Sequence, residues 1–269
     1  MTGTSTADWL VEIAGPPTRT PVPYLVPHAG AGVGAVLALG RALAGDLDPV
    51  AVRLPGREAL LDHPPVADLT TAADGLAERI TAHAAGRPVV LYGHSSGAIL
   101  AYEAARRLAA GQLALLVVSA QQAPGRPPGR ETSSWRLPTG EFFARVVADG
   151  YLPPELLADP DLLALVEPAL RADYRAVDRH MRELGEPEPV PAPVITVRAE
   201  DDATVAVDDL VAWRAVTSDH RVVSVPGGHN LLRDQPHRLA AVIREGVQRV
   251  TGTAETPIGA PVDRSPDNA

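Results

Sequence analysis

The sequence predicts an α/β fold with a mostly parallel central sheet, helices on both faces of the sheet and an inserted helical lid. Short apolar segments alternate with amphipathic helical segments over most of the 269 residues, which is the pattern of strands joined by crossover helices. The alternation stops after residue 120 and resumes near residue 190. The length suits one large domain, or one domain with an inserted subdomain.

The expected strands are short apolar runs that mostly end near Gly, Pro or Ser. They are 22–26, 49–54, 88–92, 114–119, 194–197 and 221–225. The expected helices of the core are 33–44, 69–85, 96–110, 207–217 and 235–250. In the second of these, Leu69, Ala72, Leu76 and Ile80 fall on one face of a helix. Strands connected through such helices run parallel and are covered on both sides.

A different pattern interrupts the core. Residues 121–136 are rich in Pro, Gly and Arg, and 139–184 have helical periodicity, with Pro168 expected to kink or divide that helical segment. We therefore expect an organisation with four kinds of segment. They are a flexible lead-in (1–20), a core in two parts (21–120 and 191–251), a helical lid over the carboxyl edge of the sheet (121–190) and a disordered tail (252–269).

Composition argues against several classes of protein. The chain has 24 Lys+Arg and 33 Asp+Glu, a formal net charge of −9, whereas nucleic-acid binding needs clustered cations. No apolar run is long enough to span a membrane, and residues 1–15 do not resemble a signal peptide. The absence of cysteine removes disulfides, thiolate metal sites and a Cys nucleophile. We expect a cytoplasmic protein that binds neither nucleic acid nor membranes.

Gly93-His94-Ser95-Ser96-Gly97 lies between an expected strand and an expected helix. G-x-S-x-G in that position is typical of the nucleophile elbow of α/β-hydrolases, in which a sharp turn lifts the serine hydroxyl above the sheet edge. The flanking glycines avoid collisions with the neighbouring strand and helix. We predict that Ser95 is the nucleophile and that the Ser96 N–H, at the helix N-terminus, stabilises an oxyanion. The alternative is a Gly-Ser turn without chemistry.

The base and the acid of such an enzyme follow the nucleophile in the order acid, then histidine. His229 lies in a Gly-Gly loop just past a strand, at the carboxyl edge of the sheet, and is the predicted base. Glu200, Asp201 and Asp202 follow the strand 194–197. We choose Asp202 as the acid because it is the last one before a turn of small residues, and Asp201 is the alternative.

The second oxyanion donor is expected on the loop after the first strand, where small residues let the backbone approach a substrate. We assign it to the N–H of Ala29, with Gly30 as the alternative, and interpret His28 as structural. In this mechanism the serine attacks an acyl carbonyl, the histidine takes its proton, and water then deacylates the serine. We expect no cofactor and no metal, since the sequence has no H-x-x-H pattern or carboxylate cluster.

Several stretches together resemble the type II thioesterases, which are stand-alone α/β-hydrolases that accompany polyketide synthases and nonribosomal peptide synthetases. The stretches are "LVPHAGAG", "LPGRE" (54–58), "LYGHSSGAILAYEAARRL" (91–108), "LPPELLADPDLLALVEPALRADY" (152–174), "AWR" (212–214) and "PGGHNLL" (226–232). The resemblance spans about residues 20–250. "PGRE" and "RADY" discriminate better than the elbow alone.

This resemblance implies a substrate in which an acyl group is thioesterified to the phosphopantetheine arm of an acyl or peptidyl carrier protein. It implies an editing role, the hydrolysis of stalled or aberrant acyl units, and a catalytic triad of Ser95, Asp202 and His229. We expect a monomer. The chain departs from the family pattern at Ser96, where Met is common, and at Asn230, where an aromatic residue is common. Both changes make the pocket mouth more polar and leave the acyl preference open.

Other functions would use the same three side chains. One is a chain-releasing thioesterase or acyltransferase, but the strand before the lid is followed by "AQQAPG", which lacks the acid that release domains often carry there. Another is a general carboxylesterase, which only the "PGRE" and "RADY" stretches oppose. A non-catalytic hydrolase-like binding protein is a remote alternative, because no triad member is missing.

An arginine stripe on the last lid helix could contact an acidic carrier protein. It comprises Arg171, Arg175, Arg179 and Arg182. The favoured interpretation is nevertheless ordinary intrahelical pairing, Glu167 with Arg171 and Asp178 with Arg182.

Overall fold

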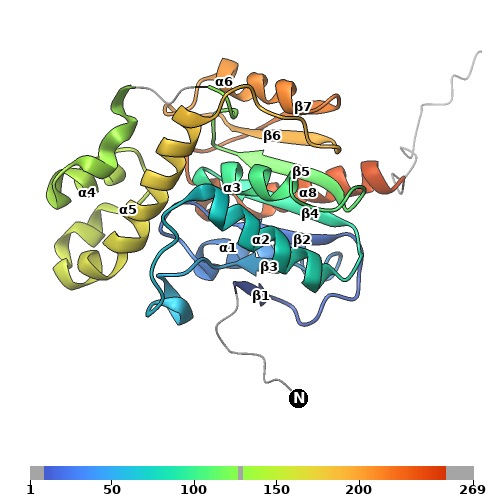
Figure 1. Cartoon of the computed structure of the whole chain (residues 1–269), viewed down its shortest axis with the longest axis horizontal. Coiled ribbons are helices and arrows are strands. Elements are labelled where there is room, and N and C mark those ends of the chain that lie inside the picture. Colours follow the sequence, from blue (N-terminus) through green and yellow to red (C-terminus); the bar gives the residue numbers. More distant parts are fainter. Residues whose placement is uncertain (1–8, 127–129, 253–269) are drawn as a thin grey trace, which may run out of the picture.

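The fold is built on a twisted sheet whose strands run almost all in one direction (Figure 1). A computed structural model describes residues 9–126 and 130–252. In the described part the strands are β1 (Leu10–Glu12), β2 (Val22–Val26), β3 (Val50–Val52), β4 (Val89–His94), β5 (Leu113–Ser119), β6 (Val194–Ala199) and β7 (His220–Val225). Their order is β1-β3-β2-β4-β5-β6-β7. Only β1 is antiparallel to its neighbour, so the predicted mostly parallel α/β sheet is confirmed.

Helices cover both faces of this sheet because its strands are apolar on both sides. Within β4, Val90 belongs to one buried cluster and Leu91 to the other. One face packs against α2 (Leu69–Ala84) and α3 (Ser96–Ala105), and the other against α1 (Val33–Leu43), α7 (Leu231–Asp234) and α8 (Pro236–Thr251). The predicted stripe of α2, from Leu69 to Ile80, is buried in the first cluster. Among the described residues, no helix combines the length and apolarity that crossing a bilayer requires.

Part of the expected flexible lead-in is ordered, which corrects that prediction. Leu10–Glu12 pairs antiparallel with β3, and Arg53 N–H donates to the Trp9 carbonyl at 2.7 Å. Ile13 then packs against Gly40 of α1, where any side chain would collide with it. A strand of this length is too short to show a period of two in the sequence. The rest of the predicted lead-in before residue 9, and the predicted tail from residue 253, lie outside the described residues.

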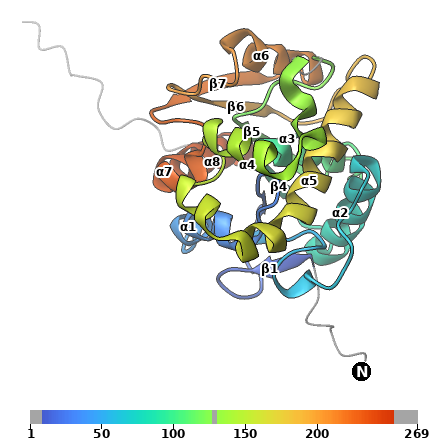
Figure 2. The same cartoon turned by 90° about the vertical axis from the view of Figure 1, so that its left-hand side faces the viewer.

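The helical block lies in front of the carboxyl ends of the strands, as Figure 2 shows. It contains α4 (Thr139–Ala148), the 3₁₀ turns η2 (Arg130–Arg136) and η3 (Pro154–Ala158), and α5 (Pro160–Glu183). We propose that this block is a lid. Its own small core is formed by Phe142, Phe143, Val146 and Leu170.

Pro168 does not divide the helical segment as expected, because α5 runs through it. A proline removes a helical hydrogen bond and crowds the preceding turn, yet this helix continues to Glu183. The break lies earlier, between α4 and α5, where Asp159 caps α5 by accepting the Leu162 N–H at 3.0 Å. The expected helix 207–217 likewise separates into α6 (Val207–Val211) and the 3₁₀ turn η4 (Ala212–Val216).

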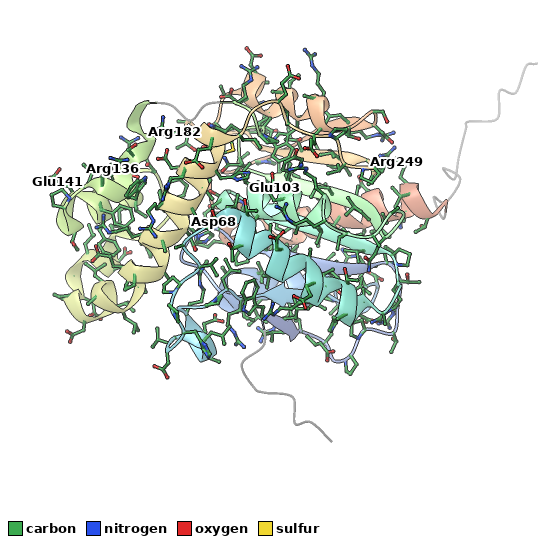
Figure 3. The ribbon with its side chains drawn as sticks, viewed as in Figure 1. Asp68, Glu103, Arg136, Glu141, Arg182 and Arg249 are labelled. Atoms are coloured by element: carbon green, nitrogen blue, oxygen red, sulfur yellow. The ribbon has the colours of Figure 1, made fainter. Side chains whose placement is uncertain are left out.

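A buried carboxylate ties α5 to the core beneath it. Glu103 of α3, labelled in Figure 3, has a side chain only 1% exposed, and its Oε1 lies 3.1 Å from His180 Nε2 of α5. Arg107 Nη1 donates to the same carboxylate at 2.6 Å. Burial alone would raise the pKa of Glu103, but hydrogen bonds from His180 and Arg107 outweigh it and lower that pKa to about 2. The carboxylate is therefore ionised at neutral pH and holds the lid helix.

Two of the arginines in the predicted stripe of α5 form the expected intrahelical pairs. Arg171 Nε donates to Glu167 at 3.0 Å, and Arg182 Nε donates to Asp178 at 2.9 Å. Arg171 also donates to the Trp135 carbonyl at 2.5 Å, which ties η2 to α5. These bonds favour a structural role for both residues.

Candidate active site

Ser95 occupies the sharp turn between β4 and α3. Its backbone has φ 53° and ψ −128°, a conformation that is strained for a residue with a side chain. A Cβ on Gly93 would collide with the Gly97 carbonyl, and a Cβ on Gly97 would collide with the Pro27 carbonyl. Both glycines are thus required by close backbone packing, and the turn has the geometry of a nucleophile elbow.

The structure brings Ser95, His229 and Asp202 into one hydrogen-bonded chain, which we call the triad. His229 Nε2 lies 3.0 Å from Ser95 Oγ, and His229 Nδ1 lies 2.8 Å from Asp202 Oδ2. Both bonds can form when Nδ1 carries the ring proton and Nε2 accepts from the serine hydroxyl. The side chains of His229 and Asp202 are 4% and 3% exposed. An arrangement of this kind can move a proton from the serine to the imidazole.

The surroundings keep Asp202 ionised. Burial by itself would raise the pKa of its carboxyl, but hydrogen bonds from His229 and Thr204 outweigh burial and lower the pKa below its ordinary value. Asp201, the alternative acid, lies elsewhere, with its Oδ2 accepting the Gly227 N–H at 3.3 Å. Only Asp202 of the two acids therefore contacts the imidazole.

The candidate oxyanion donors come from two segments, the N-terminus of α3 and the loop after β2. Ser96 is the first residue of α3, where the backbone N–H has no acceptor within the helix. The Gly30 N–H, the alternative on the loop after β2, is already donated to Asp173 Oδ2 at 2.8 Å. Ala29 therefore remains the proposed second donor. Ser95, Ser96 and Ala29 all line the same cavity.

His28 and His94 make contacts that fit structural roles. His28 Nδ1 lies 3.1 Å from the Ala29 carbonyl, and burial lowers the pKa of this imidazole. His94 is fully buried and its Nδ1 lies 2.8 Å from Ser119 Oγ. Burial holds the pKa of His94 well below its ordinary value, so the ring is neutral beside the triad.

A cavity of about 720 Å³ opens above the triad, between the sheet edge and the lid. That volume lies within the range of sites for small organic ligands. Residues of the lid that line it are Ser134, Arg145, Ala148, Asp149, Tyr151, Leu152, Leu170, Tyr174, Val177, Asp178 and Met181. The lining is mixed, with mostly apolar and aromatic groups on α5 and polar groups at Arg145, Asp149, Gln121 and Gln122.

Two residues that contact the triad were not predicted from the sequence. Thr204 Oγ1 donates to Asp202 Oδ1 at 2.6 Å and lies 3.0 Å from His229 Nδ1. A threonine two residues after an aspartate is typical of an Asx turn, and that signal could have found it. The Tyr151 ring stands edge-on to His229 with 4.2 Å between ring centroids. Burial raises the pKa of Tyr151 to about 12, so it stays a neutral phenol.

Replacing Thr204 with valine should lower kcat by about threefold to tenfold, the range that corresponds to one ordinary hydrogen bond. The valine keeps the shape of the side chain but cannot donate to Asp202, so the carboxylate and the imidazole lose part of their orientation. Steady-state kinetics on an acyl thioester measure the change. Thr217→Val is the matched control, since Thr217 donates to the Ala192 carbonyl at 2.8 Å far from the cavity. Equal activity of both variants would contradict this role.

Comparison with known proteins gives one consistent family. The family model described as Thioesterase domain matches residues 24–246. The chain is 30% identical over 229 residues to the protein named "Probable anguibactin biosynthesis thioesterase AngT" of Vibrio anguillarum. The alignment covers 82% of this chain and 89% of AngT.

Two solved structures are similar in both fold and sequence. The type II thioesterase BorB from the borrelidin biosynthetic cluster has a TM-score of 0.79 at 29% identity, covering 91% of this chain and 100% of BorB. The RedJ thioesterase from the prodiginine pathway of Streptomyces coelicolor has a TM-score of 0.75 at 27% identity, covering 84% and 89% of the two chains.

Proposed function

This chain belongs to the thioesterase family, and we propose that it hydrolyses acyl thioesters from the phosphopantetheine arm of acyl or peptidyl carrier proteins. In this proposal it acts as a cytoplasmic monomer that removes stalled or aberrant acyl units from polyketide or nonribosomal peptide synthases. AngT, BorB and RedJ are named as thioesterases of anguibactin, borrelidin and prodiginine biosynthesis, and BorB is named as a type II thioesterase. The alignments cover 89% of AngT and 100% of BorB, so the likeness extends over nearly the whole of those relatives.

The observation that carries the proposal is the 3.0 Å contact between His229 Nε2 and Ser95 Oγ at the floor of a lidded cavity. In the first half-reaction Ser95 Oγ attacks the thioester carbonyl carbon, and its proton passes to His229 Nε2. The carbonyl electron pair moves onto oxygen, where the N–H groups of Ser96 and Ala29 stabilise the charge. The intermediate then collapses, the carbon–sulfur bond breaks, and the leaving pantetheine sulfur takes the proton from His229.

Water completes the cycle. A water molecule gives a proton to His229 Nε2 and attacks the acyl carbon, which forms a second oxyanion in the same hole. Collapse returns the proton to Ser95 Oγ and releases the acyl group as a carboxylic acid. Throughout, the Asp202 carboxylate accepts a hydrogen bond from His229 Nδ1–H, with 2.8 Å between Oδ2 and Nδ1, and stabilises the imidazolium. Its lowered pKa supports this role, because the carboxylate remains charged when the ring gains its proton.

A direct comparison of substrates tests the thioester assignment. We expect kcat/KM for an acyl group carried on holo-carrier protein to exceed that of the matching ethyl oxoester by about tenfold or more, which corresponds to about 1.4 kcal/mol of transition-state stabilisation. Acyl-CoA with the same acyl group should fall between them, because it supplies the phosphopantetheine arm without the protein. Rates are measured by release of free thiol or alcohol with a single acyl group throughout.

Two outcomes would redirect the proposal. A preference for the oxoester would identify a general carboxylesterase. Transfer of the acyl group to an added amine or alcohol in preference to water would identify a chain-releasing acyltransferase. Product analysis by mass spectrometry separates these results, because the free acid, the amide and the ester differ in mass.

A further inference from the structure

A buried ion pair joins the lid helix α5 to the segment after β3. Asp173 of α5 and Arg57, which follows β3, are 9% and 6% exposed. Arg57 Nη1 donates to Asp173 Oδ2 at 2.8 Å, and Arg57 Nη2 donates to Oδ1 at 3.0 Å. This bidentate geometry fixes the guanidinium and carboxylate planes relative to each other. A buried pair is by itself weak evidence for stability, because the cost of desolvating the two charges opposes their attraction.

The same two side chains hold the loop of residues 28–31 from two directions. Asp173 Oδ2 accepts the Gly30 N–H at 2.8 Å, and Arg57 Nη1 donates to the Ala31 carbonyl at 3.0 Å. Gly30 has φ +71°, and a Cβ there would lie 2.8 Å from Leu170 Cδ1 of α5. Only glycine adopts this backbone conformation without strain, and only a residue without a side chain lets α5 approach so closely. The loop is therefore held against the lid helix.

The peptide unit between Ala29 and Gly30 is held at both of its polar atoms. Its N–H, on Gly30, is donated to Asp173, and its carbonyl, on Ala29, lies 3.1 Å from His28 Nδ1. Because a peptide unit is planar, two such contacts fix its plane. This limits the rotation of the Ala29 backbone, whose own N–H is the proposed oxyanion donor. Such a donor is effective only within about 3 Å of the developing oxyanion.

We propose that Asp173 is a positioning residue for the oxyanion hole, with Arg57 as its counter-ion. The proposal rests on the proposed function of the site. A carboxylate is required because its two oxygens together accept three hydrogen bonds, from the Gly30 N–H and from Nη1 and Nη2 of Arg57. Arg57 is required because its positive charge cancels that of Asp173, which would otherwise oppose the negative charge that forms on the substrate. The contacts that hold α5 on the core therefore also position the oxyanion hole.

Asp173→Asn tests this assignment in the full chain. An asparagine keeps the shape of aspartate, but an amide NH2 replaces one of the two carboxylate oxygens. It therefore cannot accept from Gly30 and from both guanidinium nitrogens together, and it leaves the charge of Arg57 unbalanced. We expect kcat for an acyl-pantetheine thioester to fall by about 10-fold to 100-fold, with KM changed by less than about threefold. That split is expected because the oxyanion forms only in the transition state.

A second measurement reports on the hole directly. An alkyl trifluoromethyl ketone binds serine hydrolases as a tetrahedral adduct: Ser95 Oγ bonds to the carbonyl carbon, its proton passes to His229, and the carbonyl electron pair becomes an oxyanion. The affinity for this ketone should fall in Asp173→Asn by about the same factor as kcat, since both depend on the oxyanion contacts. A loss of general stability alone would not lower both quantities together.

His180→Ala is the matched control. It removes another buried contact between α5 and the core, the 3.1 Å contact with Glu103, without touching the loop of residues 28–31. It should lower the Tm while kcat and ketone affinity stay within about twofold of the parent chain. Arg57→Met/Asp173→Leu provides a variant with an apolar pair in case Asp173→Asn fails to fold. Its Tm should approach that of the parent chain, while kcat remains low because the Gly30 N–H has lost its acceptor.

The proposal is overturned if a folded Asp173→Asn or apolar-pair variant retains the parent kcat and ketone affinity. It is also overturned if His180→Ala loses as much kcat as Asp173→Asn, because the effect would then belong to lid docking in general. The ketone measurement separates this inference from the proposed function. If the parent chain hydrolysed no thioester, and Asp173→Asn bound the ketone more weakly than the parent chain, the proposed function would be contradicted and the positioning role supported.

Discussion

Ser95→Ala should lower kcat for hydrolysis of a carrier-bound acyl thioester by about 10⁴-fold or more. The alanine removes the atom that His229 Nε2 contacts at 3.0 Å, and no acyl-enzyme can form without it. Activity that remains would come from water held near the oxyanion donors and the imidazole. Single-turnover kinetics with a radiolabelled acyl-carrier protein can follow so large a loss.

Two controls accompany this variant, its thermal stability and its ability to form an acyl adduct. The Tm should stay within about 2 °C of the parent value. The substitution removes a single side-chain hydroxyl and leaves the backbone conformation unchanged, so it should affect stability little. Intact-protein mass spectrometry after rapid quenching should show the mass of an acyl adduct on the parent chain and none on Ser95→Ala. A variant that kept full hydrolysis, or still formed the adduct, would show that another residue is the nucleophile.

The sheet and its covering helices could be predicted because their sequences are periodic over enough residues. β2, β4 and β5 are mostly apolar and almost completely buried, as is typical of strands covered on both faces. β1 was missed because Leu10–Glu12 is too short for periodicity, and its pairing with β3 depends on tertiary packing. The helicity of the lid could be predicted from Leu and Val spacing, but the continuity of α5 through Pro168 could not. A helix with strong packing contacts on both sides of a proline can continue through it.

The triad could be located because strand ends in a parallel sheet meet at one edge. Ser95, Asp202 and His229 each follow a different strand, so their proximity is a consequence of topology. The contacts from the lid could not be predicted in the same way. Tyr151 reaches His229, and Asp173 reaches Gly30, only through the packing of helices whose angles depend on the complete structure. The catalytic roles of all these residues stay predictions that the variants test.

Asp202→Asn should lower kcat by about 10³-fold to 10⁴-fold. The asparagine keeps the volume of the carboxyl but loses the charge that stabilises the imidazolium, and its amide can hold His229 with the proton on the wrong nitrogen. KM should change little, because Asp202 is separated from the substrate by the imidazole.

Asp201→Asn is the matched control and should stay within about threefold of the parent kcat, since its carboxylate contacts the Gly227 N–H rather than His229. A large loss in Asp201→Asn and a small one in Asp202→Asn would exchange the two assignments.

The same variant makes a prediction about stability and pH. The pKa of Asp202 in the folded chain lies below its ordinary value of 3.8, since hydrogen bonds from His229 and Thr204 outweigh burial. The unfolded chain therefore binds a proton more readily than the folded chain, so the ionised carboxylate stabilises the fold at neutral pH. This contribution is fully present above about pH 5 and declines as the pH falls below about 4. The difference in free energy of unfolding between the parent chain and Asp202→Asn, measured by urea titration, should shrink over that interval. A difference that stayed constant or grew on acidification would mean that Asp202 is not held ionised by His229, and the proton-transfer chain from Ser95 would lose its terminal charge.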